Sequence, residues 1–187
     1  MTRLIGLYSS VPGCGKSTVA KILVKQYDFM VQPFAAPVKN VSIAFVMQFG
    51  YSKEEAEYYL YQAKDIPIDR IPGKPTGRRI AQVVGTDMAR NLIHPNCWIA
   101  AWEVSRFKCS VVADDMRFEN EARAIKDYGG EWWQIIRPDH KAETHGHESE
   151  GRLDDLEFDQ VIINDGTQAD LLLKICNALI DGERSCR

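Results

Sequence analysis

The sequence predicts an α/β fold in which helices cover both faces of a parallel sheet. Five short apolar segments alternate with segments whose apolar residues have helical spacing. This alternation is typical of parallel sheets, because helices form the crossovers between parallel strands. In addition, the first apolar segment leads directly into the glycine-containing loop SSVPGCGKS and then into a helical pattern. A strand, such a loop and a helix in this order are typical of phosphate-binding proteins.

Composition fits a single globular domain that keeps its cysteines reduced. The 187 residues are 45% hydrophobic and carry a formal net charge of −3. That charge argues against a nucleic-acid polymer or a membrane surface as partner, since both select an excess of Lys and Arg. No apolar run approaches the about 20 residues of a membrane span. The five cysteines are widely spaced and form no C-x-x-C pair, so we expect a cytoplasmic protein without disulfides.

The first half of the chain contains two of the predicted strands. In chain order we expect a strand, a helix, a second strand and two further helices, at residues 4–8, about 16–26, 29–36, 38–49 and from 52 onward. Ser52 and Glu55 form a capping box that starts the last of these helices. A loop rich in proline and glycine, DIPIDRIPGKPTG, follows it.

The second half supplies three strands and the remaining helices. The strands are CSVVADD, EWWQIIR and QVIIN, and helices are predicted at about 78–92, 98–107, 119–128 and 167–180. Gly129 and Gly130 end the third of these helices, and Thr167 with Asp170 caps the fourth. The stretch 137–157 is polar and poor in apolar residues, so we interpret it as a flap inserted into the domain.

The loop matches the pattern G-x-x-x-x-G-K-[ST] at Gly15, Lys16 and Ser17, but Ser10 occupies the position of the first glycine. Backbone N–H groups of such a loop surround phosphate oxygens, and the helix that follows adds partial positive charge. Lys16 is expected to contact the β- and γ-phosphates and Ser17 to ligate Mg²⁺. The predicted ATP contacts in the loop are Gly13, Cys14, Gly15, Lys16, Ser17 and Thr18. Ser10 has to avoid positive φ, but the N–H groups of residues 13–18 do not depend on it.

Two acids and an arginine follow the third strand. Asp114 and Asp115 stand where a parallel sheet opens toward its ligand. One is expected to hold Mg²⁺ and the other to face the acceptor; we assign the metal to Asp114 and the acceptor to Asp115, although the sequence does not distinguish them. A solvated acidic turn is the alternative. Arg117 follows two residues later.

The helix at about 78–92 has a polar side in addition to its apolar one. Its members recur at three- and four-residue spacing: Arg79, Gln82, Thr86 and Arg90. Such a stripe suits a polar acceptor, with arginine on phosphate and glutamine on a base edge. The alternative interpretation is a solvated helix face.

Five segments resemble the deoxynucleoside monophosphate kinases encoded by bacteriophages: FAAPVK, GRRIAQVVGTDMARNLIHPNCW, VVADDMRFENEARAIKDYGG, HESE and FDQVIINDGTQADLL. The resemblance covers nearly the whole chain. It implies a three-layer P-loop NTPase fold with a five-stranded parallel sheet, a helical acceptor-binding insertion at about 38–107 and a lid at about 137–157. It also places Asn164 and Gly166 beside the adenine of ATP, for which an ordinary turn is the alternative. A viral source, and thus the cytoplasm of a host, is suggested by the resemblance alone.

Phosphoryl transfer to a monophosphate suits this set of residues. The acceptor already carries a charge of about −1.5 to −2, so its oxygen needs no general base but needs cations that offset the repulsion between two phosphates. We expect Arg117 and Arg90 to clamp the acceptor phosphate, and Arg137 and Arg152 to approach the transferring group. The remaining predicted acceptor contacts are Phe34 and Trp98, as base-stacking rings, with Lys39 and Glu121.

The function predicted is therefore ATP- and Mg²⁺-dependent phosphorylation of a (deoxy)nucleoside 5′-monophosphate to the diphosphate, for dNTP supply. Two alternatives remain: a small P-loop kinase for a nucleoside or phospho-metabolite, with Asp114 or Asp115 as base, and a nucleotide-gated switch without turnover. The bases accepted, the preference for deoxyribose and the oligomeric state are not determined, although a homodimer is compatible with the sequence. His145, His147, Glu148 and Glu150 resemble metal ligands, but we interpret them as lid residues that contact nucleotide.

Overall fold

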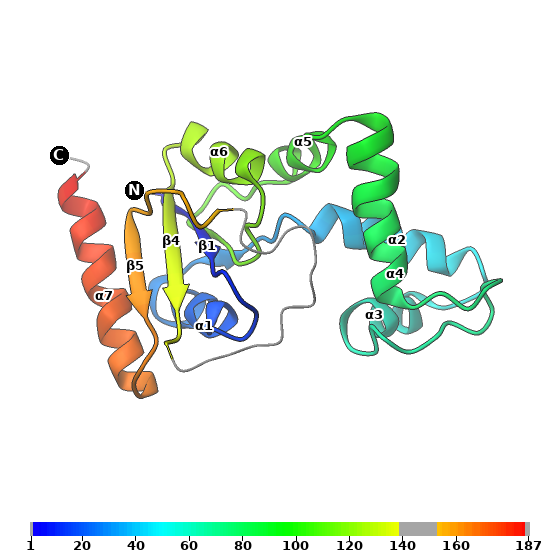
Figure 1. The fold of residues 1–187 in the computed structure, drawn as a ribbon, viewed down its shortest axis with the longest axis horizontal. Helices are drawn as coiled ribbons and strands as arrows, with labels where there is room; N and C mark the ends of the chain where they lie inside the picture. The colour runs from blue at the N-terminus through cyan, green and yellow to red at the C-terminus, as the bar shows by residue number, and fades with distance from the viewer. Residues whose placement is uncertain (1, 139–152, 186–187) are drawn as a thin grey trace. The chain divides into compact units, whose positions relative to one another are not determined.

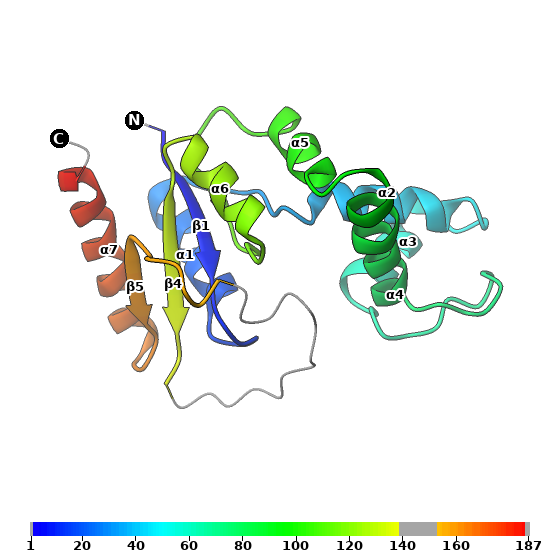
Figure 2. The ribbon, with the colours of Figure 1, turned by 45° about the horizontal axis from the view of Figure 1, so that its top comes forward.

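A computed structural model describes residues 2–138 and 153–185 of the chain and contains one parallel sheet. The sheet has five strands in the order β2-β3-β1-β4-β5, and each pair of neighbours is parallel. β1, β4 and β5 run side by side in both views (Figure 1, Figure 2). The strand bounds are Leu4–Tyr8, Met30–Val31, Val111–Ala113, Glu131–Ile136 and Gln160–Ile163 for β1 to β5. The predicted five-stranded parallel α/β fold is confirmed.

Helices occur in the order in which the sequence predicts them. Their bounds are α1 Lys16–Tyr27, α2 Ala36–Met47, α3 Lys53–Tyr61, α4 Gly77–Gln82, the π-helix η1 Val83–Ile93, α5 Cys97–Val104, α6 Glu119–Asp127 and α7 Gln168–Ser185. The second strand is much shorter than the expected 29–36, and α2 begins within that range. Pro37 stands in the first turn of α2, where its fixed φ favours a helix and its missing N–H costs nothing.

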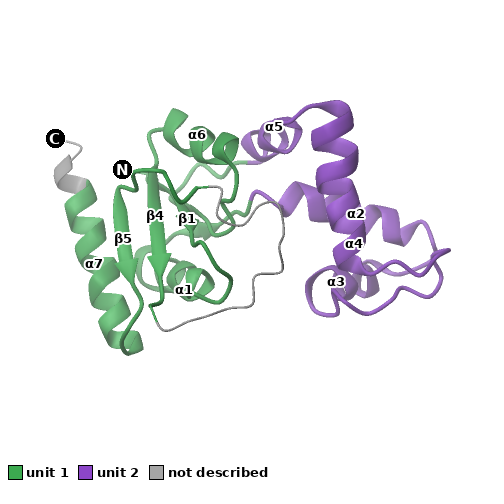
Figure 3. Cartoon of the chain, viewed as in Figure 1, with its two compact units in different colours: residues 1–33, 106–187 green, residues 34–105 purple. Residues whose placement is uncertain are grey.

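The chain divides into two compact units (Figure 3). Unit 1 comprises Met1–Pro33 and Arg106–Arg187 and contains the sheet, and unit 2 comprises Phe34–Ser105 and is helical. The acceptor-binding role predicted for about 38–107 and the lid predicted for about 137–157 remain predictions. Arg152, the histidines at 140, 145 and 147, and residues 148–150 lie outside the described residues.

In unit 1, the main core lies between the sheet and the helices α1 and α7. Ile5 and Leu7 of β1 are fully buried there with Leu23 of α1, Trp133 of β4 and Ile175 of α7. Side chains of a strand alternate between the two faces, so the intervening Gly6 faces the other way. α6 covers that second face of β1 and β4 (Figure 2).

Gly6 allows α6 to approach the sheet closely. A Cβ on this residue would lie 2.8 Å from Met116 Sδ and 3.1 Å from Ile125 Cγ1. Both side chains are fully buried. Gly6 therefore leaves space on β1 for the side chain of Met116, which directly follows the two acids. This contact helps to fix where the chain turns from β3 into α6.

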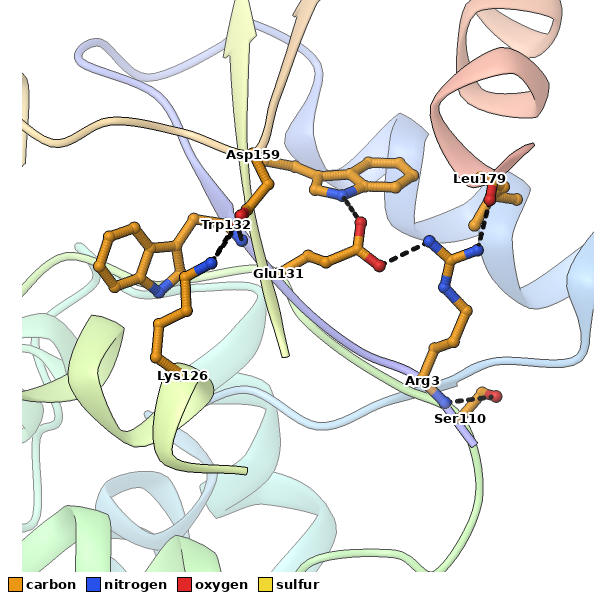
Figure 4. Close-up of polar contacts among 8 residues, drawn as sticks. Arg3, Ser110, Lys126, Glu131, Trp132, Asp159 and Leu179 are labelled. Atoms are coloured by element: carbon orange, nitrogen blue, oxygen red, sulfur yellow. Dashed lines mark hydrogen bonds and ion pairs between the residues drawn. The ribbon is translucent and has the colours of Figure 1, made fainter. Parts of the chain in front are cut away.

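A partly buried polar cluster ties the start of β1 to β4 and α7 (Figure 4). The Arg3 guanidinium forms a 2.6 Å ion pair with Glu131 and donates to the Leu179 carbonyl at 2.7 Å. The second Glu131 oxygen accepts from Trp133 Nε1 at 3.0 Å. At Gly182 of α7, a Cβ would overlap the Arg3 guanidinium. The cluster therefore fixes the last turns of α7 against the amino ends of the strands.

Unit 2 packs its helices around a second core, and the helix predicted at 78–92 changes geometry within it. Ile68, Ile80, Val84 and Trp98 are buried in this core. The helix begins as α4 but continues as the π-helix η1, ending with a bond from His94 N to Ala89 O. π-helical turns are rare in proteins, and those that occur often lie at functional sites.

The π-helix is supported from both sides at Gly85. Trp98 Nε1 donates to the Gly85 carbonyl at 2.9 Å, and a Cβ on Gly85 would approach Val38 Cγ1 to 3.2 Å. A Cβ here would require the Val38 side chain to shift slightly. The glycine is therefore explained by close helix packing within unit 2.

None of the helices in residues 2–138 and 153–185 combines the length and apolar character that a membrane span requires.

We predict that Glu131→Ala lowers the free energy of unfolding by about 2 kcal/mol, because Arg3 then loses its ion-pair partner in a mostly buried position. The melting temperature should fall by about 4–8 °C, as measured by differential scanning calorimetry. Asp127→Ala, at an exposed position in the same unit, is the control and should change stability by less than about 0.5 kcal/mol. Equal melting temperatures for the two variants would contradict the prediction.

Candidate functional site

The loop between β1 and α1 places its left-handed backbone at glycines. Gly13 has φ 82° and Gly15 has φ 108°. Among the described residues, the non-glycine positions with positive φ are Asp28 and Lys74, so Ser10 is not strained. Position 10, where the motif has its first glycine, therefore does not require a glycine. The loop geometry depends on Gly13 and Gly15.

The amino end of α1 is open to an anion. Gly15 is its N-cap residue and has no side chain to cap the helix, and its carbonyl accepts from Thr18 N at 2.9 Å and Val19 N at 3.0 Å. The first turn of α1 contains no acid, whereas α3 has Glu54 and Glu55 in its first turn. The partial positive charge of α1 is therefore not neutralised by acids of its own first turn, as an anion site requires.

Lys16 is held within the loop by its neighbours. Its ammonium group donates to Ser9 Oγ, and that hydroxyl donates to the Val11 carbonyl at 2.8 Å. Burial lowers the pKa of Lys16, and the nearby Arg117 lowers it further. Cys14, Asp114 and Asp115 act in the opposite direction. A desolvated ammonium group beside a second cation is stabilised when a polyanion binds.

The two acids stand at the same edge of the sheet as the loop. Ala113 at the end of β3 pairs with Gly6 of β1, two residues before that strand ends. Asp114 and Asp115 follow Ala113 directly and are half-buried. The structure therefore brings together the predicted residues Lys16, Asp114, Asp115 and Arg117 within unit 1.

Glu121, predicted to contact the acceptor, is bound to the backbone before α6. Its Oε2 accepts from Arg117 N at 2.9 Å and from Phe118 N at 3.2 Å, and the residue is 3% exposed. These bonds fix the backbone of Arg117, and Arg117 itself is exposed to solvent. This bond is predictable, because Glu121 stands at the third position of a helix, where a carboxylate returns to the N-cap.

Asn164 fastens the loop from the end of β5. Its side-chain Nδ2 donates to the Cys14 carbonyl at 2.9 Å, and its backbone N donates to the Ile136 carbonyl at 2.6 Å. A Cβ on Gly15 would lie 2.5 Å from Asn164 Nδ2. The adenine contact predicted for Asn164 and Gly166 stays a prediction. The bond to the loop joins residues 150 positions apart, and no local pattern in the sequence indicates it.

The predicted aromatic acceptor contacts are buried in unit 2. Phe34 is 3% exposed and packs on Trp102 with ring centroids 4.6 Å apart, and Trp98 is 6% exposed. Lys39 lies over the ring of Tyr61, 4.2 Å from its centroid. These contacts give the residues roles in packing, and their contact with a base stays a prediction.

The predicted polar stripe of unit 2 lies partly on α4 and partly on η1. Gln82, Thr86 and Arg90 are half-buried, and Arg79 forms an exposed 3.8 Å ion pair with Asp87. Arg137 of the predicted lid is exposed just after β4. No group of three or more His, Cys, Asp or Glu side chains in residues 2–138 and 153–185 is placed to hold a metal ion.

Known proteins similar to this chain share one description. The family model for deoxynucleotide monophosphate kinase matches residues 45–175. A putative deoxynucleotide monophosphate kinase of Acanthamoeba polyphaga mimivirus is 31% identical over 179 residues, which cover 88% of this chain and 89% of that protein. The deoxynucleotide monophosphate kinase of Enterobacteria phage T4 is 27% identical over 164 residues, covering 84% of this chain and 66% of the phage protein.

We predict that Gly15→Ala weakens binding of ATP by at least about tenfold. Alanine at φ 108° is strained, and its Cβ would displace Asn164 from the loop. Isothermal titration calorimetry with ATP measures the effect. Gly129→Ala is the matched control, because Gly129 also has positive φ, at 70°, but a Cβ there meets no atom within 4 Å. The control should lose stability and keep its ATP affinity; an unchanged affinity of Gly15→Ala would contradict the prediction.

Proposed function

The chain belongs to the deoxynucleotide monophosphate kinase family, and we propose that the loop before α1 binds the phosphates of ATP while Arg117 and unit 2 bind the acceptor. The enzyme phosphorylates deoxynucleoside monophosphates. One observation best supports the proposed placement of the ATP phosphates at the loop and of the acceptor at Arg117. In unit 1, burial and the nearby cation of Arg117 both lower the pKa of Lys16, which stands at a helix start whose first turn contains no acid. Bound phosphates would offset both effects.

The proposed reaction needs cations and no catalytic base. An oxygen of the acceptor monophosphate attacks the γ-phosphorus of ATP, a new P–O bond forms, and the bond to the β–γ bridging oxygen breaks. ADP leaves with that electron pair. Because the attacking oxygen is already ionised, the protein has to offset the repulsion between two phosphates. Lys16 on the β- and γ-phosphates and Arg117 on the acceptor phosphate supply this charge.

Mg²⁺ fits the residues beside Lys16. We propose that the Ser17 hydroxyl and the Asp114 carboxylate hold it, since hydroxyl and carboxylate oxygens are the ligands this ion accepts. Held there, Mg²⁺ would neutralise part of the negative charge on the phosphates during transfer. Asp115 is left to face the acceptor. Both acids already act on Lys16 electrostatically, so each stands near the loop that binds phosphate.

Unit 2 is proposed to bind the acceptor, with Arg90 on its phosphate and Gln82 on a base edge. Its polar residues on α4 and η1 are Arg79, Gln82, Thr86 and Arg90. Phe34, Trp98 and Lys39 complete the proposed set. Arg137 and Arg152 are proposed to reach the transferring phosphate, and Asn164 with Gly166 the adenine. The named relatives are viral, which supports a proposed location in the cytoplasm of an infected host.

A survey of acceptors tests the proposed function. Purified protein with ATP and Mg²⁺ is offered deoxynucleoside monophosphates, ribonucleoside monophosphates, nucleosides and small phospho-alcohols, and release of ADP is followed by a coupled assay. Turnover is expected with one or more deoxynucleoside monophosphates. Turnover with nucleosides alone, or tight ATP binding without turnover of any acceptor, would overturn the proposal.

We predict that Arg117→Ala raises the KM for the acceptor by at least about tenfold and lowers kcat, because a charge-assisted contact to phosphate is lost. The KM for ATP should change much less. Steady-state kinetics with each substrate varied in turn measures both. Arg123→Ala removes an exposed arginine six residues later and should leave both constants within about twofold. Normal acceptor kinetics of Arg117→Ala would remove Arg117 from the site.

A second prediction separates the two acids. Asp114→Asn should raise the Mg²⁺ concentration needed for half-maximal rate by about tenfold, because a neutral amide is the weaker ligand. Asp115→Asn should leave that requirement unchanged and alter the KM for the acceptor. Rates measured across a Mg²⁺ titration, at saturating and at low acceptor, distinguish the variants. The opposite pattern would exchange the two assignments.

A further inference from the structure

We propose that Asp154 is a positioning residue for the phosphate-binding loop, acting through the hydroxyls of Tyr8 and Ser10; this rests on the proposed role of that loop in binding ATP. The Tyr8 hydroxyl donates to Asp154 Oδ1 at 2.7 Å. The Ser10 hydroxyl donates to the same oxygen at 2.6 Å. One carboxylate oxygen thus joins the last residue of β1 to the first part of the loop.

Asp154 is placed by a segment that is anchored to unit 1 on both sides of it. Leu153 is fully buried, and its carbonyl accepts from Leu156 N in a turn at 3.2 Å. The ring of Phe158 stacks on Tyr8, with centroids 5.5 Å apart and ring planes 9° apart. The carboxylate is therefore held at the loop by the fold and not by its own bonds alone.

The far end of this segment is fixed to the strand beside β1. Asp159 N donates to the Trp132 carbonyl at 3.0 Å, and the Asp159 carboxylate accepts from Trp132 N at 2.6 Å and from Lys126 Nζ at 2.6 Å (Figure 4). Movement of residues 153–159 would break these bonds. Asp154 can therefore restrain the loop instead of following it.

This contact gives a reason for serine at position 10. The motif has glycine there, but the backbone of Ser10 has no positive φ, so conformation does not demand a glycine. The hydroxyl is what distinguishes serine from glycine, and it is bonded to Asp154. Burial and the bond to Asp154 raise the pKa of Tyr8 to about 12, and its hydroxyl donates to the same carboxylate oxygen.

The restraint matters because the loop binds phosphate through aligned backbone N–H groups. A loop that is ordered before binding loses less conformational entropy when the ligand arrives. The Ser9 hydroxyl donates to the Val11 carbonyl and Asn164 donates to the Cys14 carbonyl. The bond from Ser10 to Asp154 adds a third restraint on the loop. The charge of Asp154 acts in the opposite direction, since a carboxylate near the loop repels phosphates. Removing the side chain tests which effect prevails.

The test is ATP binding by the full chain, measured by calorimetry without acceptor. Asp154→Ala and Ser10→Ala should each weaken ATP binding by about three- to tenfold. The double variant should be no weaker than the poorer single one, because both remove the same contact. Asp154→Asn keeps an oxygen acceptor without the charge and should restore affinity to within about twofold. Asp155→Ala, at an exposed acid next to it, is the control and should bind normally.

Tighter ATP binding by both Asp154→Ala and Asp154→Asn would overturn the proposal, because charge repulsion would then be the dominant effect. Unchanged binding by Asp154→Ala would also overturn it. If Asp154→Ala fails to fold, the variant that combines Tyr8→Phe with Ser10→Ala removes both donors and should show the same weakening. These outcomes are distinct from failure of the proposed function, because turnover of deoxynucleoside monophosphates by the unsubstituted enzyme is measured in parallel.

Discussion

The left-handed backbone at Gly15 is the constraint on which the candidate site depends. This residue ends the loop and caps α1, so its carbonyl starts the helix while its missing side chain leaves room for Asn164. Asn164 in turn comes from the end of β5, at one edge of the sheet. The geometry of the proposed phosphate-binding loop is therefore set by strand pairing as well as by its own glycines. A rigid sheet supports a loop whose N–H groups have to point inward before the ligand arrives.

Charged side chains of both signs gather beside the loop in unit 1. Lys16 is desolvated and close to Arg117, while two acids stand beside them. Glu121 is buried and accepts from the backbone N–H groups of Arg117 and Phe118. These bonds fix the backbone from which the Arg117 side chain extends. Bound phosphates would offset the burial of Lys16 and its repulsion from Arg117.

In unit 2, residues with a proposed function lie on a helix that is also tightly packed. In the π-helix η1, Trp98 donates to the Gly85 carbonyl, and Val38 leaves little room for a Cβ on Gly85. The same helix holds Thr86 and Arg90. A wider turn changes which side chains stand next to each other, so the packing around Gly85 also determines how these polar residues are presented.

The sequence by itself determined the alternation of strands and helices, the loop with Lys16 and Ser17, the acids after β3 and the family. These features are local, since they depend on the period of apolar residues, on glycine conformations and on caps within a few positions. The tertiary structure decided what links distant positions. It joins Asn164 to Cys14 and Ser10 to Asp154 by hydrogen bonds. It also limits β2 to two residues and turns the helix into a π-helix from Val83 onward. These features depend on contacts between residues far apart in the chain, whose side chains meet only after the sheet has formed, and no spacing in the sequence encodes such a meeting.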